Sequence, residues 1–254
     1  MKRKFLYCGI ALFSLTLMAF MKPVPKITLY LIGDSTLSVK EKKAYPETGW
    51  GMPFAVFFDA QVRIDNRAQN GRSTKSFLAE NRWQPVADSL KEGDYVLIQF
   101  GHNDEAKEKT DRYTAVPDFK NNLLKFVKES RSKGAKPILI TPVSRRKFDQ
   151  NGNALETHKE YTQAVIDVAM QEQVPLIDLD QKSRALYQKF GVEQSKLLFN
   201  QLEAGVHPNY PEGKMDNTHF NELGAREIAQ IVLQEIKKLE PGLAAYVVKS
   251  SAVK

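Results

Sequence analysis

The sequence alternates short apolar runs, rich in β-branched residues, with longer segments in which apolar residues recur at helical spacing. Such alternation is typical of a parallel β-sheet, because parallel strands need a helical crossover between them. Five strands are predicted, over residues 27–33, 62–68, 94–101, 136–142 and 174–179. The clearest helices are expected over residues 117–133, 156–173, 180–189 and 221–239, with Asn221 as the N-cap of the last. The expected fold class is therefore α/β, with a five-stranded parallel sheet between two layers of helices.

The chain is long enough to bury a full core, since it has 254 residues of which 42% are apolar. It contains no internal repeat and no low-complexity linker, so residues 22–254 are expected to form a single domain. Three longer loops are predicted, over residues 39–51, 144–155 and 204–218.

The first 21 residues differ from the rest, because a basic start is followed by 16 residues without charge, from Phe5 to Phe20. This is the layout of a secretory signal peptide, and it predicts export to the periplasm or beyond the cell. A retained N-terminal anchor is the alternative, although the uncharged stretch is shorter than the roughly 20 residues of a membrane span. Cys8, the only cysteine, lies in this stretch, so the mature chain would depend on its core and not on disulfides.

The formal net charge is +7, and removal of Lys2, Arg3 and Lys4 would lower it to +4. Such a mild excess could attract an anionic polymer, or it could simply solvate the surface. Basic and aromatic residues are not interleaved as they are in nucleic-acid-binding proteins, so no nucleic-acid partner is expected. A membrane partner is expected only if the N-terminal segment is retained.

Small polar residues follow each of the first three predicted strands. They are Gly33-Asp34-Ser35, Asn70-Gly71-Arg72-Ser73 and Gly101-His102-Asn103-Asp104. Each segment alone could be an ordinary turn, because turns favour these residue types. However, open parallel sheets carry their chemistry at the carboxyl ends of the strands, where all three segments are expected to meet.

Together with Asp216 and His219 near the C-terminus, these segments supply the parts of an acyl-transfer site. Ser35 would be the nucleophile in a strand-to-helix turn, and His219 its base. Asp216 precedes His219 by three residues, so one compact loop could carry both and let the carboxylate orient the ring. The N–H groups of Ser35 and Gly71 and the side-chain amide of Asn103 would face the oxyanion. Asp34 is expected to order its own turn, and no metal or other cofactor is required.

These blocks resemble, in order, those of the SGNH (GDSL-type) hydrolase superfamily, over about residues 27–239. Within them, "GDST", "GWG" at residues 49–51, "NGRSTKSF" and "DNTHFNELGA" are similar to rhamnogalacturonan acetylesterases. The resemblance implies a flavodoxin-like α/β/α fold and metal-independent deacetylation of pectic polysaccharides. It also implies a nucleophile, two oxyanion donors and the rest of a triad, at Ser35, Gly71, Asn103, Asp216 and His219. Thr36 is a departure, since the wider superfamily often has leucine there.

Three residues are candidates for substrate contact, each with a structural alternative. Trp50 could stack on a sugar or lie in the core, His102 could touch the substrate or shape its loop, and His207 could line the pocket or be solvated. His158 is expected at the surface. The basic runs at residues 39–43 and 144–147 could meet pectic carboxylates, although solvated loops are the expected reading, and no role follows for Arg72.

The predicted function is that of a secreted serine esterase that deacetylates plant cell-wall polysaccharide, with pectic rhamnogalacturonan foremost, through an acetyl-enzyme on Ser35. Acetylated xylan and short-chain lipid or thioester substrates remain alternatives. A metal-dependent phosphatase or nuclease is a further one, with Asp34, Asp104, Asp216 and several histidines as ligands, although the usual dense ligand motifs are missing. The last alternative is a carbohydrate-binding protein on an inactive hydrolase scaffold.

Overall fold

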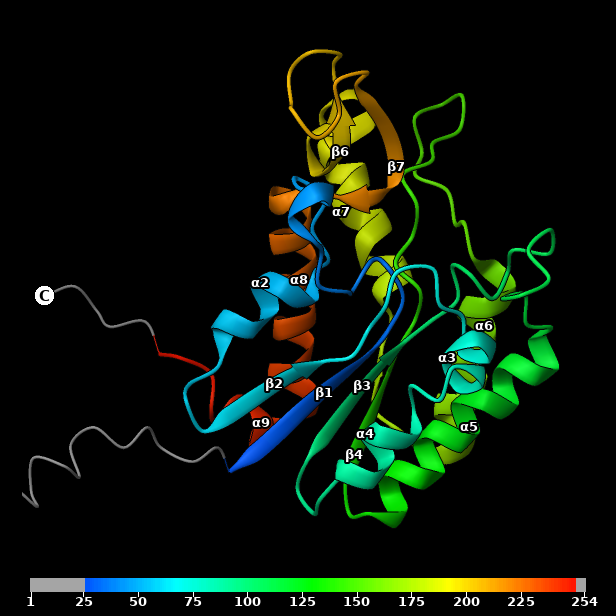
Figure 1. The fold of residues 1–254 in the computed structure, drawn as a ribbon, viewed down its shortest axis with the longest axis vertical. Coiled ribbons are helices and arrows are strands. Elements are labelled where there is room, and N and C mark those ends of the chain that lie inside the picture. The colour runs from blue at the N-terminus through cyan, green and yellow to red at the C-terminus, as the bar shows by residue number, and fades with distance from the viewer. Residues whose placement is uncertain (1–25, 250–254) are drawn as a thin grey trace, which may run out of the picture.

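The computed structural model describes residues 26–249 and contains a five-stranded sheet in which all neighbouring strands run parallel. The strand order is β2-β1-β3-β4-β5 (Figure 1), as in flavodoxin-like folds. The strands are β1 (Ile27–Gly33), β2 (Val62–Asn66), β3 (Tyr95–Gln99), β4 (Lys136–Ile140) and β5 (Leu176–Ile177). The predicted fold class and the five predicted strands are confirmed.

Helices cover both faces of the sheet (Figure 1). One face packs against α2 (Gly51–Phe54), α7 (Leu179–Gln194), α8 (Glu222–Leu239) and α9 (Pro241–Ala244). The other packs against α3 (Thr74–Ala79), α4 (Gln84–Ser89), α5 (Val116–Ser132) and α6 (Lys159–Glu172). The four predicted helices correspond to α5, α6, α7 and α8, and the side chain of Asn221 caps α8 by accepting a hydrogen bond from the N–H of Gly224 (3.1 Å).

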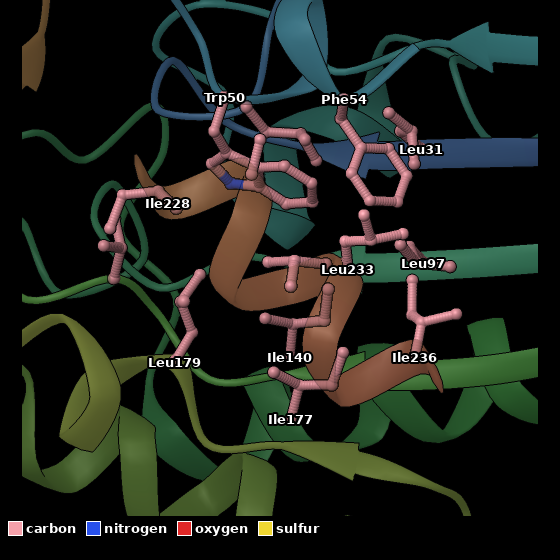
Figure 2. Packing of buried hydrophobic residues seen from close by; sticks show 14 of the residues in the cluster. Leu31, Trp50, Phe54, Leu97, Ile140, Ile177, Leu179, Ile228, Leu233 and Ile236 are labelled. Atoms are coloured by element: carbon pink, nitrogen blue, oxygen red, sulfur yellow. The ribbon is translucent and has the colours of Figure 1, made fainter. Parts of the chain in front are cut away.

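The pleat of the strands separates two hydrophobic cores. Leu31 of β1 and Leu97 of β3 point toward α8, whereas Ile32 and Ile98 point toward α5 and α6. Figure 2 shows the first core, in which Leu97 lies beside Leu233 of α8. Because the central strands are buried on both faces, their sequences are continuous apolar runs.

A second, two-stranded sheet stands above the main one in Figure 1. It is an antiparallel hairpin of β6 (Phe199–Leu202) and β7 (Lys214–Phe220). The prediction of a loop over residues 204–218 is therefore wrong for residues 214–218, which belong to β7. The sequence KMDNTHF of β7 is largely polar and only Phe220 is buried, so it lacks the alternation that marks a strand.

Short helices account for the other elements that the sequence pattern does not reveal. The helices α2, α3 and α4 have four to six residues, too few to show helical periodicity. The start of α3 does carry a local signal, because Ser73 and Ser76 cap it reciprocally.

Within residues 26–249, no helix combines the length and the apolar content needed to cross a membrane. The expected signal peptide at residues 1–21, with Cys8, lies outside the described residues.

Candidate active site

Ser35 lies in the turn that follows β1. The carboxylate of Asp34 accepts hydrogen bonds from the backbone N–H and the hydroxyl of Thr36 (2.9 and 2.8 Å), which confirms that Asp34 orders its own turn. Burial raises the pKa of Asp34, and the hydrogen bonds from Thr36 oppose that rise. Ser35 itself is only 8% exposed.

The expectation that Ser35 occupies a strand-to-helix turn is wrong. The chain makes one turn, closed by the N–H groups of Leu37 and Ser38 on the carbonyl oxygen of Asp34 (3.3 and 3.1 Å). It then runs through the short 3-10 helix η1 (Lys42–Ala44), and α2 begins only at Gly51. Within the described residues, Ser35 therefore does not lie at the N-terminus of the helix that follows β1.

The hairpin brings the other two triad candidates to Ser35. The Nε2 atom of His219 lies 2.9 Å from Ser35 Oγ, although the two residues are 184 positions apart in the sequence. The Nδ1 atom of His219 lies 2.8 Å from Asp216 Oδ2. Both residues lie on β7, and not in the compact loop that the sequence suggests. The three side chains form one continuous hydrogen-bonded line.

Asp216 is held in its ionised form. Burial alone would raise its pKa, but the hydrogen bond to the His219 ring and the N–H groups of Thr218 and His219 (2.7 and 2.9 Å) outweigh burial and lower the pKa to about 2. A carboxylate that stays charged can hold the ring N–H and stabilise the imidazolium that forms when His219 accepts a proton.

Candidate oxyanion donors come from the loops after β1, β2 and β3. Gly71 has φ +75°, a conformation that favours glycine. The side-chain amide of Asn103 donates to the carbonyl oxygen of Arg72 (3.1 Å), which joins the two later loops. Within the described part of the chain, the N–H groups of Ser35 and Gly71 donate to no other group, so both remain free for a substrate oxygen.

A polar cavity of about 400 Å³ opens beside Ser35. It is lined by Ser35, His102, Asn103, Glu105, Ala106, Glu108, Lys109, Arg145, Thr218 and His219. Its charged walls suit a polar substrate. A larger hollow of about 870 Å³ lies along α6, but none of its lining residues belongs to the candidate triad.

The sequence pattern of GDSL-like lipases and acylhydrolases matches residues 31–226. This chain belongs to that family. As a GDSL-like acylhydrolase, it is a carboxylic ester hydrolase.

This acylhydrolase is 43% identical to the rhamnogalacturonan acetylesterase RhgT of Bacillus subtilis, over 84% of its own length and 90% of RhgT. It is 36% identical to YesY of the same bacterium, a probable rhamnogalacturonan acetylesterase, over 87% of its length and 97% of YesY. Among solved structures, the B. subtilis protein YxiM matches with a TM-score of 0.73 and 26% identity, although the match covers 87% of this chain and only 58% of YxiM. The acetylxylan esterase Axe2 of Geobacillus stearothermophilus matches with a TM-score of 0.56 and 18% identity, over 85% of this chain and 96% of Axe2. At this identity the match shows only that the two proteins share a fold.

Trp50 is a core residue of this acylhydrolase and not a sugar-stacking one, which corrects its candidate role. Its side chain is 0% exposed and packs on α8 near Ile228 (Figure 2). Its indole N–H donates to Oε1 of Gln99 (2.7 Å), and Nε2 of Gln99 donates to the Thr36 hydroxyl (2.6 Å). Through Gln99, Trp50 therefore stabilises the turn that contains Ser35 and Thr36. The sequence analysis did not identify Gln99 as a functional residue. A glutamine at the end of an otherwise apolar buried strand could have indicated a buried hydrogen-bonding role.

The glycines on either side of Trp50 let two segments of the acylhydrolase meet. A Cβ on Gly49 would lie 2.0 Å from the carbonyl oxygen of Ser38, and one on Gly51 would lie 2.5 Å from that of Leu37. The "GWG" motif thus packs its backbone directly against the turn that carries the nucleophile candidate.

Lys40 corrects the reading of residues 39–43 as a solvated run. Its side chain is 2% exposed and forms an ion pair with Glu47 at 2.7 Å. Burial lowers the pKa of the Lys40 ammonium, and Glu47 opposes that effect. The alternation of Lys and Glu in this run gives no hint of which lysine is buried.

The basic run at residues 144–147 is likewise not simply solvated. Arg145 pairs with Glu105 (2.6 Å) in the wall of the cavity. Arg146 donates to Oδ1 of Asn217 and Oγ of Ser195 (both 2.9 Å), so it fastens the hairpin to the loop after β4. Arg72, for which no role was derived, donates to the carbonyl oxygen of Asn70 (2.8 Å).

Two histidines with adjoining rings lie at the cavity, His102 in its wall and His158 behind His102. His102 is 5% exposed, lines the cavity and places Nε2 at 2.8 Å from the carbonyl oxygen of Val143. Burial lowers the pKa of His102 well below its usual range, so the ring is neutral. The expectation that His158 is a surface residue is wrong, because its ring is buried against His102 (4.2 Å between centroids) and bonds to Glu105 (2.9 Å). A helix N-cap is usually exposed, but here the loop after β3 covers it.

His207 lies in the turn of the hairpin, near Tyr45 and Tyr210 (5.8 and 6.2 Å between ring centroids), and it does not line the Ser35 cavity. Its candidate role as a pocket residue of this cavity is therefore wrong.

Within residues 26–249, no three His, Cys, Asp or Glu side chains are placed to share a metal ion. The carboxylates of the metal alternative are instead bonded to protein groups. Asp34 binds Thr36, Asp104 binds the N–H and hydroxyl of Thr74 (2.9 and 2.6 Å), and Asp216 binds His219.

Proposed function

We propose that this enzyme removes O-acetyl groups from a plant cell-wall polysaccharide, rhamnogalacturonan foremost, through an acetyl-enzyme on Ser35. The observation that carries the proposal is the line from Ser35 Oγ to His219 Nε2 (2.9 Å) and from His219 Nδ1 to Asp216 Oδ2 (2.8 Å) beside a polar cavity. The 43% identity to a rhamnogalacturonan acetylesterase supports the choice of substrate.

Acylation begins when Nε2 of His219 takes the proton of Ser35 and the serine oxygen attacks the acetyl carbonyl carbon. The N–H groups of Ser35 and Gly71 and the amide of Asn103 donate to the oxygen that becomes negative. The bond between the acetyl carbon and the sugar oxygen then breaks, and His219 gives its proton to that oxygen.

Deacylation repeats these steps with water. His219 takes a proton from the water as it attacks the acetyl-enzyme, and acetate leaves when the proton returns to Ser35. Asp216 holds the ring of His219 throughout and stays ionised.

The decisive experiment measures acetate release from acetylated rhamnogalacturonan, xylan and chitin oligosaccharides. Wild-type enzyme should release acetate fastest from rhamnogalacturonan, and Ser35→Ala and His219→Ala should each lower the rate on the order of 10⁶-fold. Ser132→Ala, on the exposed end of α5, is the matched control and should keep the full rate. Wild-type turnover by Ser35→Ala contradicts the mechanism, and a preference for xylan contradicts the substrate.

Two further arms address the alternatives. Nitrophenyl acetate should be cleaved much faster than the octanoyl ester, because the charged walls of the cavity offer no channel for a long acyl chain. Preincubation with a chelator should leave the rate unchanged, since the proposed steps use only protein groups.

We also propose that the chain is exported, because its first residues have the layout of a signal peptide. Sequencing the N-terminus of the enzyme recovered from outside the cytoplasm tests this. A cleaved start near residue 22 supports export, and recovery only from the cytoplasm contradicts it.

A further inference from the structure

The ammonium group of Lys40 has three hydrogen-bond acceptors around it. They are the backbone carbonyl oxygen of Ser35 (2.5 Å), Oδ1 of Asn70 (2.7 Å) and Oε1 of Glu47 (2.7 Å). A lysine ammonium has three N–H donors, so every donor is used.

These contacts join two loops of the site. Ser35 carries the candidate nucleophile after β1, and Asn70 directly precedes Gly71, the candidate oxyanion donor after β2. Backbone hydrogen bonds connect the two loops only as far as Gln69, whose N–H donates to the carbonyl oxygen of Gly33 (3.0 Å). Beyond that point, two side chains bridge Ser35 and Asn70. Lys40 donates to both, and the Ser38 hydroxyl lies 3.3 Å from the Ser35 carbonyl oxygen and 2.5 Å from Oδ1 of Asn70. Lys40 has a separate N–H for each acceptor, whereas the hydroxyl has a single proton to donate.

The side chain of Asn70 is also fixed in orientation. Its Oδ1 accepts hydrogen bonds from Lys40 and from the hydroxyl of Ser38 (2.5 Å). Two donors on the same oxygen define which end of the amide faces Lys40, and the residue before Gly71 is thereby held in place.

Burying an ammonium is unfavourable unless it is paired and fully hydrogen-bonded. Lys43, three residues along the same run, forms its ion pair with Glu41 in solvent, with both side chains more than 70% exposed. Lys40 is instead 2% exposed, with Glu47 beside it at 13%. One of the three acceptors of Lys40 is the backbone carbonyl oxygen of Ser35, so the buried ammonium directly restrains the turn that carries the candidate nucleophile.

We propose that Lys40, paired with Glu47, is a positioning residue for acyl transfer. It holds the Ser35 turn and the Asn70–Gly71 segment at the separation at which the hydroxyl and the Gly71 N–H reach the same acyl group. This proposal rests on the proposed function only through the roles of Ser35 and Gly71. A displacement of about 1 Å between such groups can lower a rate about a hundredfold.

The test is the double variant Lys40→Met with Glu47→Gln, which removes both charges and leaves neither buried without a partner. Nitrophenyl acetate is the substrate, because its cleavage does not depend on which polysaccharide the enzyme uses. We expect kcat to fall by about thirtyfold or more, with KM changed less than about twofold, because alignment and not binding is lost.

The matched control is Lys182→Met with Glu235→Gln. This pair joins α7 to α8 at 3.2 Å, with side chains 32% and 15% exposed, and neither residue lines the cavity. We expect its kcat to stay within about twofold of wild type. The single variant Glu47→Gln, which keeps the ammonium and its two other contacts, should lose about threefold and serves if the double variant does not fold.

Amide hydrogen exchange provides a readout that needs no activity. Exchange in residues 33–40 and 68–73 should be about tenfold faster in the double variant, while exchange in β3 and β4 stays as in wild type. Unchanged exchange in both segments overturns the proposal, as does a kcat within twofold of wild type. Wild-type enzyme that cleaves nitrophenyl acetate but releases no acetate from polysaccharide overturns the proposed substrate alone.

Discussion

Asp216 decides which nitrogen of His219 carries the proton. Its Oδ1 accepts the N–H groups of Thr218 and His219, and its Oδ2 faces Nδ1 of the ring. From these contacts we assign the proton to Nδ1, which leaves the lone pair of Nε2 for Ser35. The carboxylate thus acts through orientation.

Asp216→Asn should therefore be severe. The two backbone N–H groups keep the asparagine oxygen in the Oδ1 position, so its amide N–H₂ faces the ring and forces the proton onto Nε2. We expect kcat to fall on the order of 10⁴-fold with folding intact, as measured by nitrophenyl acetate turnover and thermal melting. Asp216→Ala removes the carboxylate without imposing that tautomer and should lose less. Equal or higher activity of the asparagine variant would contradict the assigned tautomer.

Gly49 offers a test of the support beneath the Ser35 turn. In Gly49→Ala, the new Cβ would lie 2.0 Å from the Ser38 carbonyl oxygen, and neither backbone segment can yield without moving the turn. We expect kcat to fall about tenfold or more, with a lower melting temperature. Gly205→Ala is the control, because its Cβ would meet nothing within 4 Å and only its φ of +78° is strained. That variant should lose about 1 kcal/mol of stability and no activity.

Among the elements, the β6–β7 hairpin is outside the main sheet and yet carries Asp216 and His219. Its attachment to the rest of the site includes the hydrogen bond from Arg146 to Asn217 (2.9 Å) and the bonds of Asn209 to the carbonyl oxygens of Lys42 and Tyr45 (2.9 and 2.8 Å). These contacts hold the hairpin over the carboxyl ends of β1 and β4.

A hydrogen-bonded chain also links three elements beneath the site. Gln99 of β3 joins Trp50, next to α2, to Thr36 after β1. Gln99→Leu leaves the indole N–H and the threonine hydroxyl buried without this partner, so the free energy of unfolding should fall by about 2–4 kcal/mol. Urea denaturation measures the change. Combining Gln99→Leu with Trp50→Phe should cost less than the sum of the two single changes, and strict additivity would count against a direct contact.

The sequence predicts those elements whose signals are local. The strands and α5 to α8 show long apolar runs or helical periodicity, and Ser35, Asp216 and His219 were identified because each lies in a recognisable block. The sequence does not predict the hairpin, because β7 is polar. It does not predict the role of Lys40 either, because the burial of Lys40 depends on two partners that the sequence does not identify: Glu47, one of several acidic residues nearby, and Asn70, 30 residues further along the chain. Trp50 illustrates a further limit, since one residue type suits both a core and a sugar site.

At the scale of the whole molecule, buried polar groups connect the core beneath α3, α5 and α6 to the site. Asp104 is 0% exposed, and it binds Thr74 at the start of α3. The hydroxyl of Tyr161 on α6 donates to the Asp104 carbonyl oxygen (3.0 Å). Burial raises the pKa of the Asp104 carboxyl to about 7, against the hydrogen bonds from Thr74, which lower it.

This raised pKa predicts how stability depends on pH. Between about pH 4 and 7 the folded chain keeps a proton on Asp104 that the unfolded chain releases, so the free energy of unfolding should fall as pH rises through this range and level off above it. Asp104→Asn has no proton to lose. The difference in unfolding free energy, wild type minus variant, should therefore decrease by up to about 1.4 kcal/mol for each pH unit. Urea titrations at several pH values measure it, and parallel curves for the two proteins would contradict the raised pKa.

The distance along the chain between Ser35 and His219 sets an order of events during synthesis. A growing chain acquires its serine early, but the histidine and the strand that carries it are added 184 residues later. Ester cleavage by this route can begin only after the ribosome has passed residue 219 and β7 has paired with β6. A chain truncated before that point would hold an inert hydroxyl.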